Sequence, residues 1–153
     1  MANLPPLEET LLPFEEGDCL ELDELWSFVF KRKNKRWVWL AMCRRTRQIV
    51  AYAIGCRGEK TCRMLWERIP ISYKVAHCYS DLWDAYAQVI PKDQLLQSPQ
   101  RGPTNHIERF NGTIRQRVGR LTRKSLSFSK MDHMHEAAIQ LFLHAYNSQH
   151  NLH

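Results

Sequence analysis

The first half of the chain alternates apolar and polar side chains in a way that predicts three consecutive strands. In residues 19–30 an extended backbone places Asp23 on one face and Leu22 on the other. Residues 36–43 and 49–54 form the second and third runs, and short basic turns separate the three. Short turns between neighbouring strands predict an antiparallel meander.

Beyond residue 57 helical spacing takes over, interrupted by one apolar strand. We expect a short helix at residues 60–68, a buried strand at 73–79 and a second helix at 82–90. A loop or short strand follows at 92–104, and then two longer helices at 105–121 and 130–147. Ser129 with Asp132 resembles a capping box for the last helix. This order predicts an α/β fold, with a mixed sheet of about five strands flanked by helices.

The length of 153 residues fits one domain. We expect residues 1–18 to be an acidic lead-in or linker, residues 19–147 the domain, and residues 148–153 a tail. No apolar run approaches the ~18 residues that a membrane span needs, and no signal peptide is visible. The five cysteines are an odd number in apolar surroundings, so we expect no disulfide framework and a reducing cytoplasm.

The formal net charge of +6 is distributed unevenly. Residues 1–24 contain eight acidic residues and no lysine or arginine. Residues 31–47 hold eight basic residues and no acid, and residues 101–130 hold eight with Glu108 as the only acid. Basic stripes of this density favour a polyanionic partner, nucleic acid rather than membrane, over a merely solvated face.

Three acidic residues stand where chemistry could use them. Asp23 lies within the first strand, Asp81 follows the buried strand, and Glu108 lies one turn into a helix. Each has a simpler interpretation. Asp23 could be an edge residue among solvated acids, and Asp81 could cap the helix that follows it. Glu108 could be a surface ion-pair partner of Arg109 or Arg115. Together, three carboxylates fit a site for hard cations, and two magnesium ions can activate water and stabilise the leaving oxygen of a phosphodiester.

Four sequence blocks carry a resemblance to a known family. They are LDELW (22–26), YSDLWDAY (79–86), NHIERFNGTIRQR (105–117) and RKSLSFSK (123–130). They resemble transposases of the insertion sequence 1 family, which are DDE-type enzymes with a ribonuclease-H-like core. The resemblance runs from about Cys19 to Asn147, and the last block is its most specific part.

The resemblance implies that Asp23, Asp81 and Glu108 are the catalytic triad and hold two Mg²⁺ (or Mn²⁺) ions. It also implies that residues around the glutamate contact DNA or orient the metal-bound groups, and that further basic residues hold phosphates. These DNA-binding candidates are His106, Arg109, Asn111, Arg115, Arg117, Arg120, Arg123 and Lys124.

The implied partners are the terminal inverted repeats of the element, target DNA and a second copy of the chain. The zinc-binding and helix-turn-helix region typical of this family has no counterpart in the sequence, so the chain resembles the catalytic half, joined to or assisted by an upstream-frame protein. The implied location is the bacterial cytoplasm, at the nucleoid. Two alternatives stay open: a non-catalytic DNA-binding regulatory fragment, and a stand-alone ribonuclease-H-like nuclease.

Overall fold

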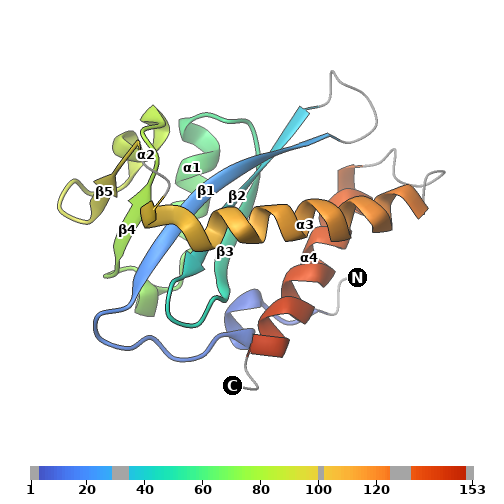
Figure 1. Ribbon diagram of the computed structural model, residues 1–153, viewed down its shortest axis with the longest axis horizontal. Coiled ribbons are helices and arrows are strands. Elements are labelled where there is room, and N and C mark those ends of the chain that lie inside the picture. The colour runs from blue at the N-terminus through green and yellow to red at the C-terminus, as the bar shows by residue number, and fades with distance from the viewer. Residues whose placement is uncertain (1–3, 29–34, 100–101, 125–131, 151–153) are drawn as a thin grey trace.

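Five strands form one mixed sheet at the centre of the molecule (Figure 1). The computed structural model describes residues 4–28, 35–99, 102–124 and 132–150. In sheet order the strands are β3 (Ile49–Gly55), β2 (Lys35–Cys43), β1 (Cys19–Phe28), β4 (His77–Ser80) and β5 (Leu95–Gln97). The first three in sequence are antiparallel neighbours, and β4 and β5 run parallel to β1. The predicted mixed sheet with an antiparallel meander is confirmed.

Helices cover both faces of this sheet. The two shorter helices, α1 (Glu59–Arg68) and α2 (Asp84–Val89), lie on one face, and α3 (Asn105–Lys124) and α4 (Asp132–His150) lie on the other (Figure 1). Single turns of 3-10 helix occur at Leu7–Thr10, Ile71–Tyr73 and Gly102–Thr104. The predicted α/β class with flanking helices is therefore confirmed.

Three expected boundaries differ from the structure or lie outside it. The strand expected from residue 73 begins at His77, because Pro70 is followed by a 3-10 turn. The helix expected from residue 82 begins at Asp84, after an extended segment. The proposed capping box of the last helix includes Ser129, which lies outside the described residues.

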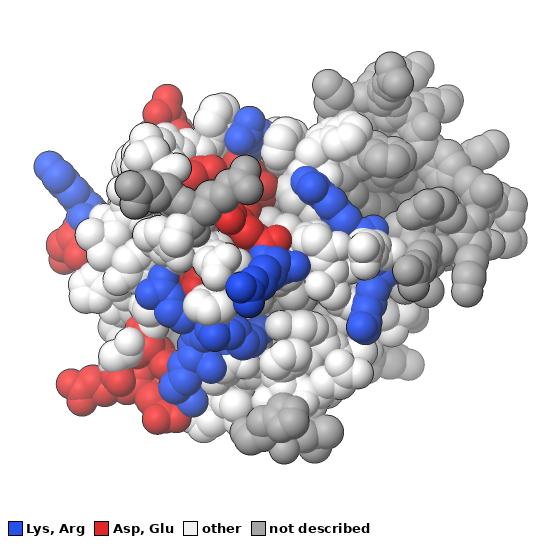
Figure 2. All heavy atoms as spheres, in the orientation of Figure 1, with Lys and Arg blue, Asp and Glu red and all other residues white. Residues whose placement is uncertain are grey.

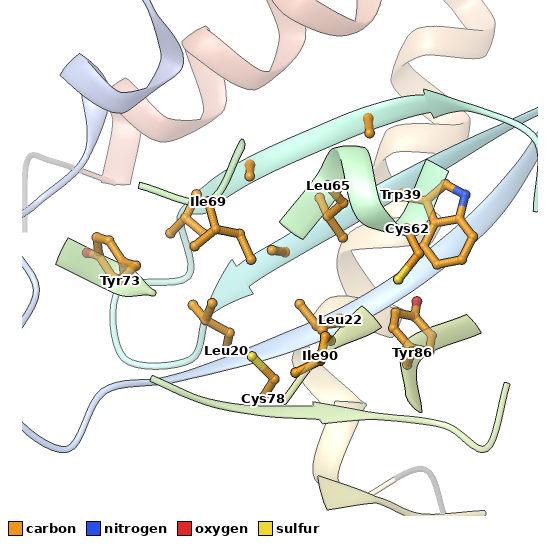
Figure 3. Close-up of a cluster of buried hydrophobic side chains, with 14 of the residues drawn as sticks. Leu20, Leu22, Trp39, Cys62, Leu65, Ile69, Tyr73, Cys78, Tyr86 and Ile90 are labelled. Atoms are coloured by element: carbon orange, nitrogen blue, oxygen red, sulfur yellow. The ribbon is translucent and has the colours of Figure 1, made fainter. Parts of the chain in front are cut away.

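Side-chain alternation along the strands divides the interior into two apolar clusters. Under α1 and α2, Leu20 and Leu22 of β1 pack with Trp39 of β2 and Tyr86 of α2 (Figure 3). Under α3 and α4, alternate residues of the same strands, such as Leu40, pack against both helices. Because β2 is covered on both faces, it has the near-continuous apolar sequence of a buried strand. Each fully buried large side chain contributes roughly 1.5–3 kcal/mol.

A buried polar network joins the N-terminal segment, β3 and α4. The Asn147 side chain is fully buried; its Oδ1 accepts from the Ile49 amide at 2.8 Å, and its Nδ2 donates to the Ile49 carbonyl and to Thr10 Oγ1, both at 2.9 Å. Gln48 donates to the carbonyls of Thr10 and Asn147. These bonds tie residues 10–12 to the domain, because Gln48 Oε1 also accepts from the Leu12 amide.

Two further observations concern the described part of the chain. No helix in it combines the length and apolar character that crossing a membrane requires. All five cysteines are free thiols.

The polar network predicts a large cost for one truncation. Asn147→Ala leaves the buried amide and carbonyl of Ile49 without their side-chain partner, so we expect a loss of about 2–4 kcal/mol in the free energy of unfolding. In a chain of this size that lowers Tm by about 4–16 °C, measurable by thermal denaturation. Gln149→Ala, at an exposed position of the same helix, is the control and is expected to change Tm by less than about 2 °C. Equal effects of the two substitutions would contradict the role given to the network.

Candidate active site

The parallel register of β1 and β4 brings two aspartates together. Glu21 pairs with Tyr79, so two residues further along both strands lie Asp23 and Asp81, the latter one residue beyond β4. Their carboxylates each offer an oxygen within 4.8 Å of the other. Asp23 is half-buried on the central strand, so its alternative interpretation as a solvated edge residue is wrong.

The third acid of this 4.8 Å group is Glu24, which the sequence analysis did not single out. Its side chain is buried on the opposite face of β1 from that of Asp23. There Oε1 accepts from the Tyr86 hydroxyl at 2.6 Å, and Oε2 pairs with the Arg57 guanidinium at 3.0 Å. Both oxygens are therefore committed within the protein. The signal in the sequence was a second acid beside Asp23 at a position that alternation assigns to the apolar face.

Glu108 approaches the same region from α3. It is half-buried in the first turn, and its Oε1 accepts from Thr104 Oγ1 at 3.2 Å. Among the described residues it forms no ion pair with Arg109 or Arg115, the alternative considered for it. Three residues later, on the same flank of the helix, Asn111 Nδ2 donates to Asp23 Oδ2 at 2.7 Å. Glu108 lies outside the 4.8 Å group but close enough for its charge to affect Asp23.

The start of α3 is held against β1 by a carboxylate that sequence reasoning also missed. Glu21 is fully buried, and its Oε1 accepts from the backbone amides of His106 and Ile107, each at 3.0 Å. Its Oε2 contacts His106 Nδ1 at 2.7 Å and Arg44 Nε at 2.9 Å. A negative charge at a helix N-terminus is stabilising. Burial alone would raise the pKa of Glu21, but these hydrogen bonds outweigh burial and hold it below its usual value.

The surroundings of Asp23 raise its pKa, whereas those of Glu21 lower the pKa of that residue. Burial raises the pKa of Asp23 most, and the neighbouring charge of Glu24 raises it further. Asp81 and Glu108 add to the effect, while the Glu24 amide, which donates to Asp23 Oδ1 at 2.9 Å, opposes it. The result is a pKa of about 7 for Asp23. Like charges this close disfavour joint ionisation.

Asp81 is not the cap of α2, the alternative considered for it, because the N-cap residue is Trp83 and it has no side-chain cap hydrogen bond. Asp81 Oδ1 accepts from the Trp83 amide at 3.0 Å, which fixes the extended segment before α2. One indole face of Trp83 receives the Arg57 guanidinium at 4.1 Å, and Trp83 Nε1 donates to the Arg57 carbonyl. The second oxygen of Asp81 has no such contact among the described residues, so the bond to the Trp83 amide leaves it open for a ligand.

The DNA-binding candidates separate into three groups. Arg109, Arg115 and Arg117 are exposed on α3, on a face where basic side chains gather beside acidic ones (Figure 2). The His106 ring contacts Glu21, and Asn111 is only 8% exposed with its amide on Asp23. Burial excludes a surface contact for Asn111 and leaves the other role considered, orienting a carboxylate. Arg120, Arg123 and Lys124 belong to α3, but their side chains lie outside the described part.

The donor set fits a hard divalent cation. Carboxylate oxygens are the ligands that Mg²⁺ and Mn²⁺ prefer. A further oxygen, the buried Oδ1 of Asn111, has no hydrogen-bond partner within the described residues. An unsatisfied buried acceptor costs about 1–3 kcal/mol, and mutual repulsion of the carboxylates adds to that cost. A bound cation would relieve both.

A five-stranded sheet of this order, with acids at adjacent ends of β1 and β4 and a third acid on the helix packed across them, defines a ribonuclease-H-like α/β protein. The model of the IS1 transposase family matches residues 18–149, so the chain belongs to that family.

Similar curated proteins carry insertion-element names. The insertion element iso-IS1n protein InsB of Shigella dysenteriae is 37% identical over 123 residues, which are 80% of this chain and 92% of that protein. The insertion element IS1 protein InsB of Shigella flexneri is 35% identical over 82% of this chain and 93% of its own length. The IS1 4 protein InsB of Escherichia coli K12 is 34% identical over 82% and 73% respectively.

The raised pKa of Asp23 predicts a particular pH dependence of stability without divalent ions. Between an unfolded pKa of about 3.9 and the folded value of about 7, the folded chain holds a proton that the unfolded chain releases. Stability therefore falls as pH rises from 5 to 8. Asp23→Asn removes this pH dependence. We therefore expect the free energy of unfolding of the variant minus that of wild type to be about 1–3 kcal/mol more favourable to the variant at pH 8 than at pH 5. Urea denaturation in EDTA measures this.

The exposed Asp93→Asn is the control and is expected to show no such gain. A stability difference between Asp23→Asn and wild type that is the same at both pH values would refute the assignment.

Proposed function

We propose that this chain is the catalytic domain of a DNA transposase that hydrolyses phosphodiesters at the element ends and then transfers the freed strands to target DNA. The observation that carries the proposal is that Asp23 and Asp81 lie together, with Glu108 near enough for its charge to raise the pKa of Asp23, in a chain of the IS1 transposase family. An acid pair alone is common, but this pair lies at the centre of the sheet with a basic face beside it.

In this proposal the three carboxylates hold two Mg²⁺ or Mn²⁺ ions. When bound, such ions activate a water molecule and stabilise the leaving oxygen of the phosphodiester. Asp23 gives up its proton on binding them, because ligation needs the carboxylate. Asn111 keeps Asp23 Oδ2 in a fixed orientation through its amide hydrogen bond.

The reaction needs no covalent bond to the protein. In the first step water attacks phosphorus, and the bond from phosphorus to the 3′ oxygen breaks to give a 3′-hydroxyl and a 5′-phosphate. In the second step that hydroxyl attacks a target phosphodiester, so one phosphorus–oxygen bond forms as another breaks. Positioning of the DNA is therefore the main task of the remaining residues.

The exposed arginines of α3 are proposed to hold the DNA backbone. Arg109, Arg115 and Arg117 have no acidic partner among the described residues. We extend the proposal to Arg120, Arg123 and Lys124 on the same helix. A second copy of the chain and an upstream-frame zinc-finger or helix-turn-helix protein complete the proposed complex, in the bacterial cytoplasm at the nucleoid.

The proposal is tested with the purified chain, supercoiled plasmid carrying element ends, and Mn²⁺. We expect wild type to nick the plasmid and form joined products. Asp23→Asn, Asp81→Asn and Glu108→Gln should each lower the rate by at least about a hundredfold, since each removes several kcal/mol of charge stabilisation from the transition state. Gel retardation of DNA should be unchanged in all three, and Asp93→Asn should cut normally.

Three outcomes would contradict the proposal. Full nicking by Asp23→Asn would remove this residue from the mechanism. Retardation without nicking by wild type would favour the non-catalytic regulatory fragment. Cut products without joined products would favour the stand-alone nuclease.

A further inference from the structure

A hollow on the flank of α3 opposite Glu108 and Asn111 is lined by basic residues from two separate segments. Its cavity volume is about 250 Å³, and it lies between the turn joining β2 to β3, the first turns of α3, and α4. Arg47, His106, Arg109 and Thr113 provide its polar lining. We call it the Arg47 pocket. None of the described residues lining it is acidic, so its electrostatic character is cationic.

The backbone of Arg47 is an independent sign that its side chain matters. Arg47 is the one non-glycine residue with a positive φ (64°) in the described part of the chain. A side chain in this left-handed region costs roughly 1–2 kcal/mol, which glycine avoids and asparagine reduces. The turn itself is closed by the Arg47 amide, which donates to the Cys43 carbonyl at 2.8 Å. That bond requires no arginine.

The Arg47 guanidinium has donors to spare. One nitrogen, Nη1, donates to the Arg44 carbonyl, whereas a guanidinium has five N–H groups. Glu21, which His106 of the pocket contacts, is fully buried and has both oxygens engaged by His106, Ile107 and Arg44. The positive charges of Arg47 and Arg109 are therefore not neutralised within the pocket.

We infer that the Arg47 pocket binds a backbone phosphate of the DNA on which the carboxylates across α3 act. This inference rests on the proposed function and extends it, because the turn between β2 and β3 joins α3 as part of the DNA-binding surface. His106 connects the two sites: its ring lines the pocket and contacts Glu21, which precedes Asp23 by two residues on the same face of β1. Phosphate oxygens suit paired guanidinium donors.

The inference is tested by the salt dependence of binding to duplex DNA in EDTA, where no cutting occurs. Loss of one phosphate contact lowers the slope of log K against log salt by about 0.9. We expect this change in Arg47→Gly and in Arg47→Asn, both of which suit a positive φ, with Tm unchanged or higher. Arg47→Lys should keep the slope. Arg63→Gln, on α1 at the opposite face of the sheet, also removes one charge and should leave the slope unchanged.

Inorganic phosphate provides a second arm, since it offers the same chemistry without a nucleic acid. At constant ionic strength we expect it to weaken DNA binding by wild type and not by Arg47→Gly. A reduced salt slope in the Arg47 variants without competition by inorganic phosphate also supports the inference, and means that the pocket binds only a phosphate of the DNA backbone. Phosphate competition with an unchanged DNA slope overturns the inference, since an adventitious ion only is then held.

The remaining outcomes distinguish this inference from the proposed function. An unchanged slope in both Arg47 variants overturns the pocket, even if wild type cuts DNA. A fall in Tm with an unchanged slope also overturns it, because Arg47 then only fastens the turn. An equal reduction of the salt slope in Arg63→Gln also overturns the inference, because the slope would then respond to the loss of any positive charge. A reduced slope in the Arg47 variants supports the pocket even if wild type fails to cut, in which case only the proposed catalysis fails.

Discussion

The buried carboxylate of Glu21 fixes where the long helix α3 begins. It satisfies two backbone amides at the helix start and pairs with Arg44, all without solvent access to its side chain. Since α3 is thereby held against the central strand, Asn111 contacts Asp23 and the charge of Glu108 affects it. The acidic site, the exposed arginines of α3 and the Arg47 pocket all take their positions from this attachment.

The candidate site concentrates charge in a way that disfavours the metal-free fold. Asp23 lies on β1 beside Glu24 and near Asp81, which follows the end of β4, and the side chains packed on both faces of the sheet are largely apolar. Burial and like charges together raise its pKa to about 7, and Asn111 keeps an acceptor without a partner. Glu24 is different, because Tyr86 and Arg57 take both of its oxygens. Unfavourable terms confined to one place are typical of functional sites.

The sequence predicted the elements better than their contacts. Alternation located β1, β2 and β3, and helical spacing located α1 and α3, because each buries one well-marked face. The start of β4 was misplaced, since an apolar run does not show where a 3-10 turn ends. Asp23, Asp81 and Glu108 were selected as candidates by position and resemblance, but how they lie relative to one another depends on strand register and helix docking. For the same reason Glu21, Glu24 and Arg47 could not be assigned: their roles come from partners distant in sequence.

The central claim is that Asp23, Asp81 and Glu108 form one site for divalent cations, and a direct count of bound Mn²⁺ by electron paramagnetic resonance tests it. At pH 8 we predict two ions per wild-type chain in the presence of DNA, with the same count in the Asp93→Asn control. Asp23→Asn, Asp81→Asn and Glu108→Gln should each bind fewer ions or bind them at least about tenfold more weakly. Equal stoichiometry and affinity in wild type and all three variants would contradict the account.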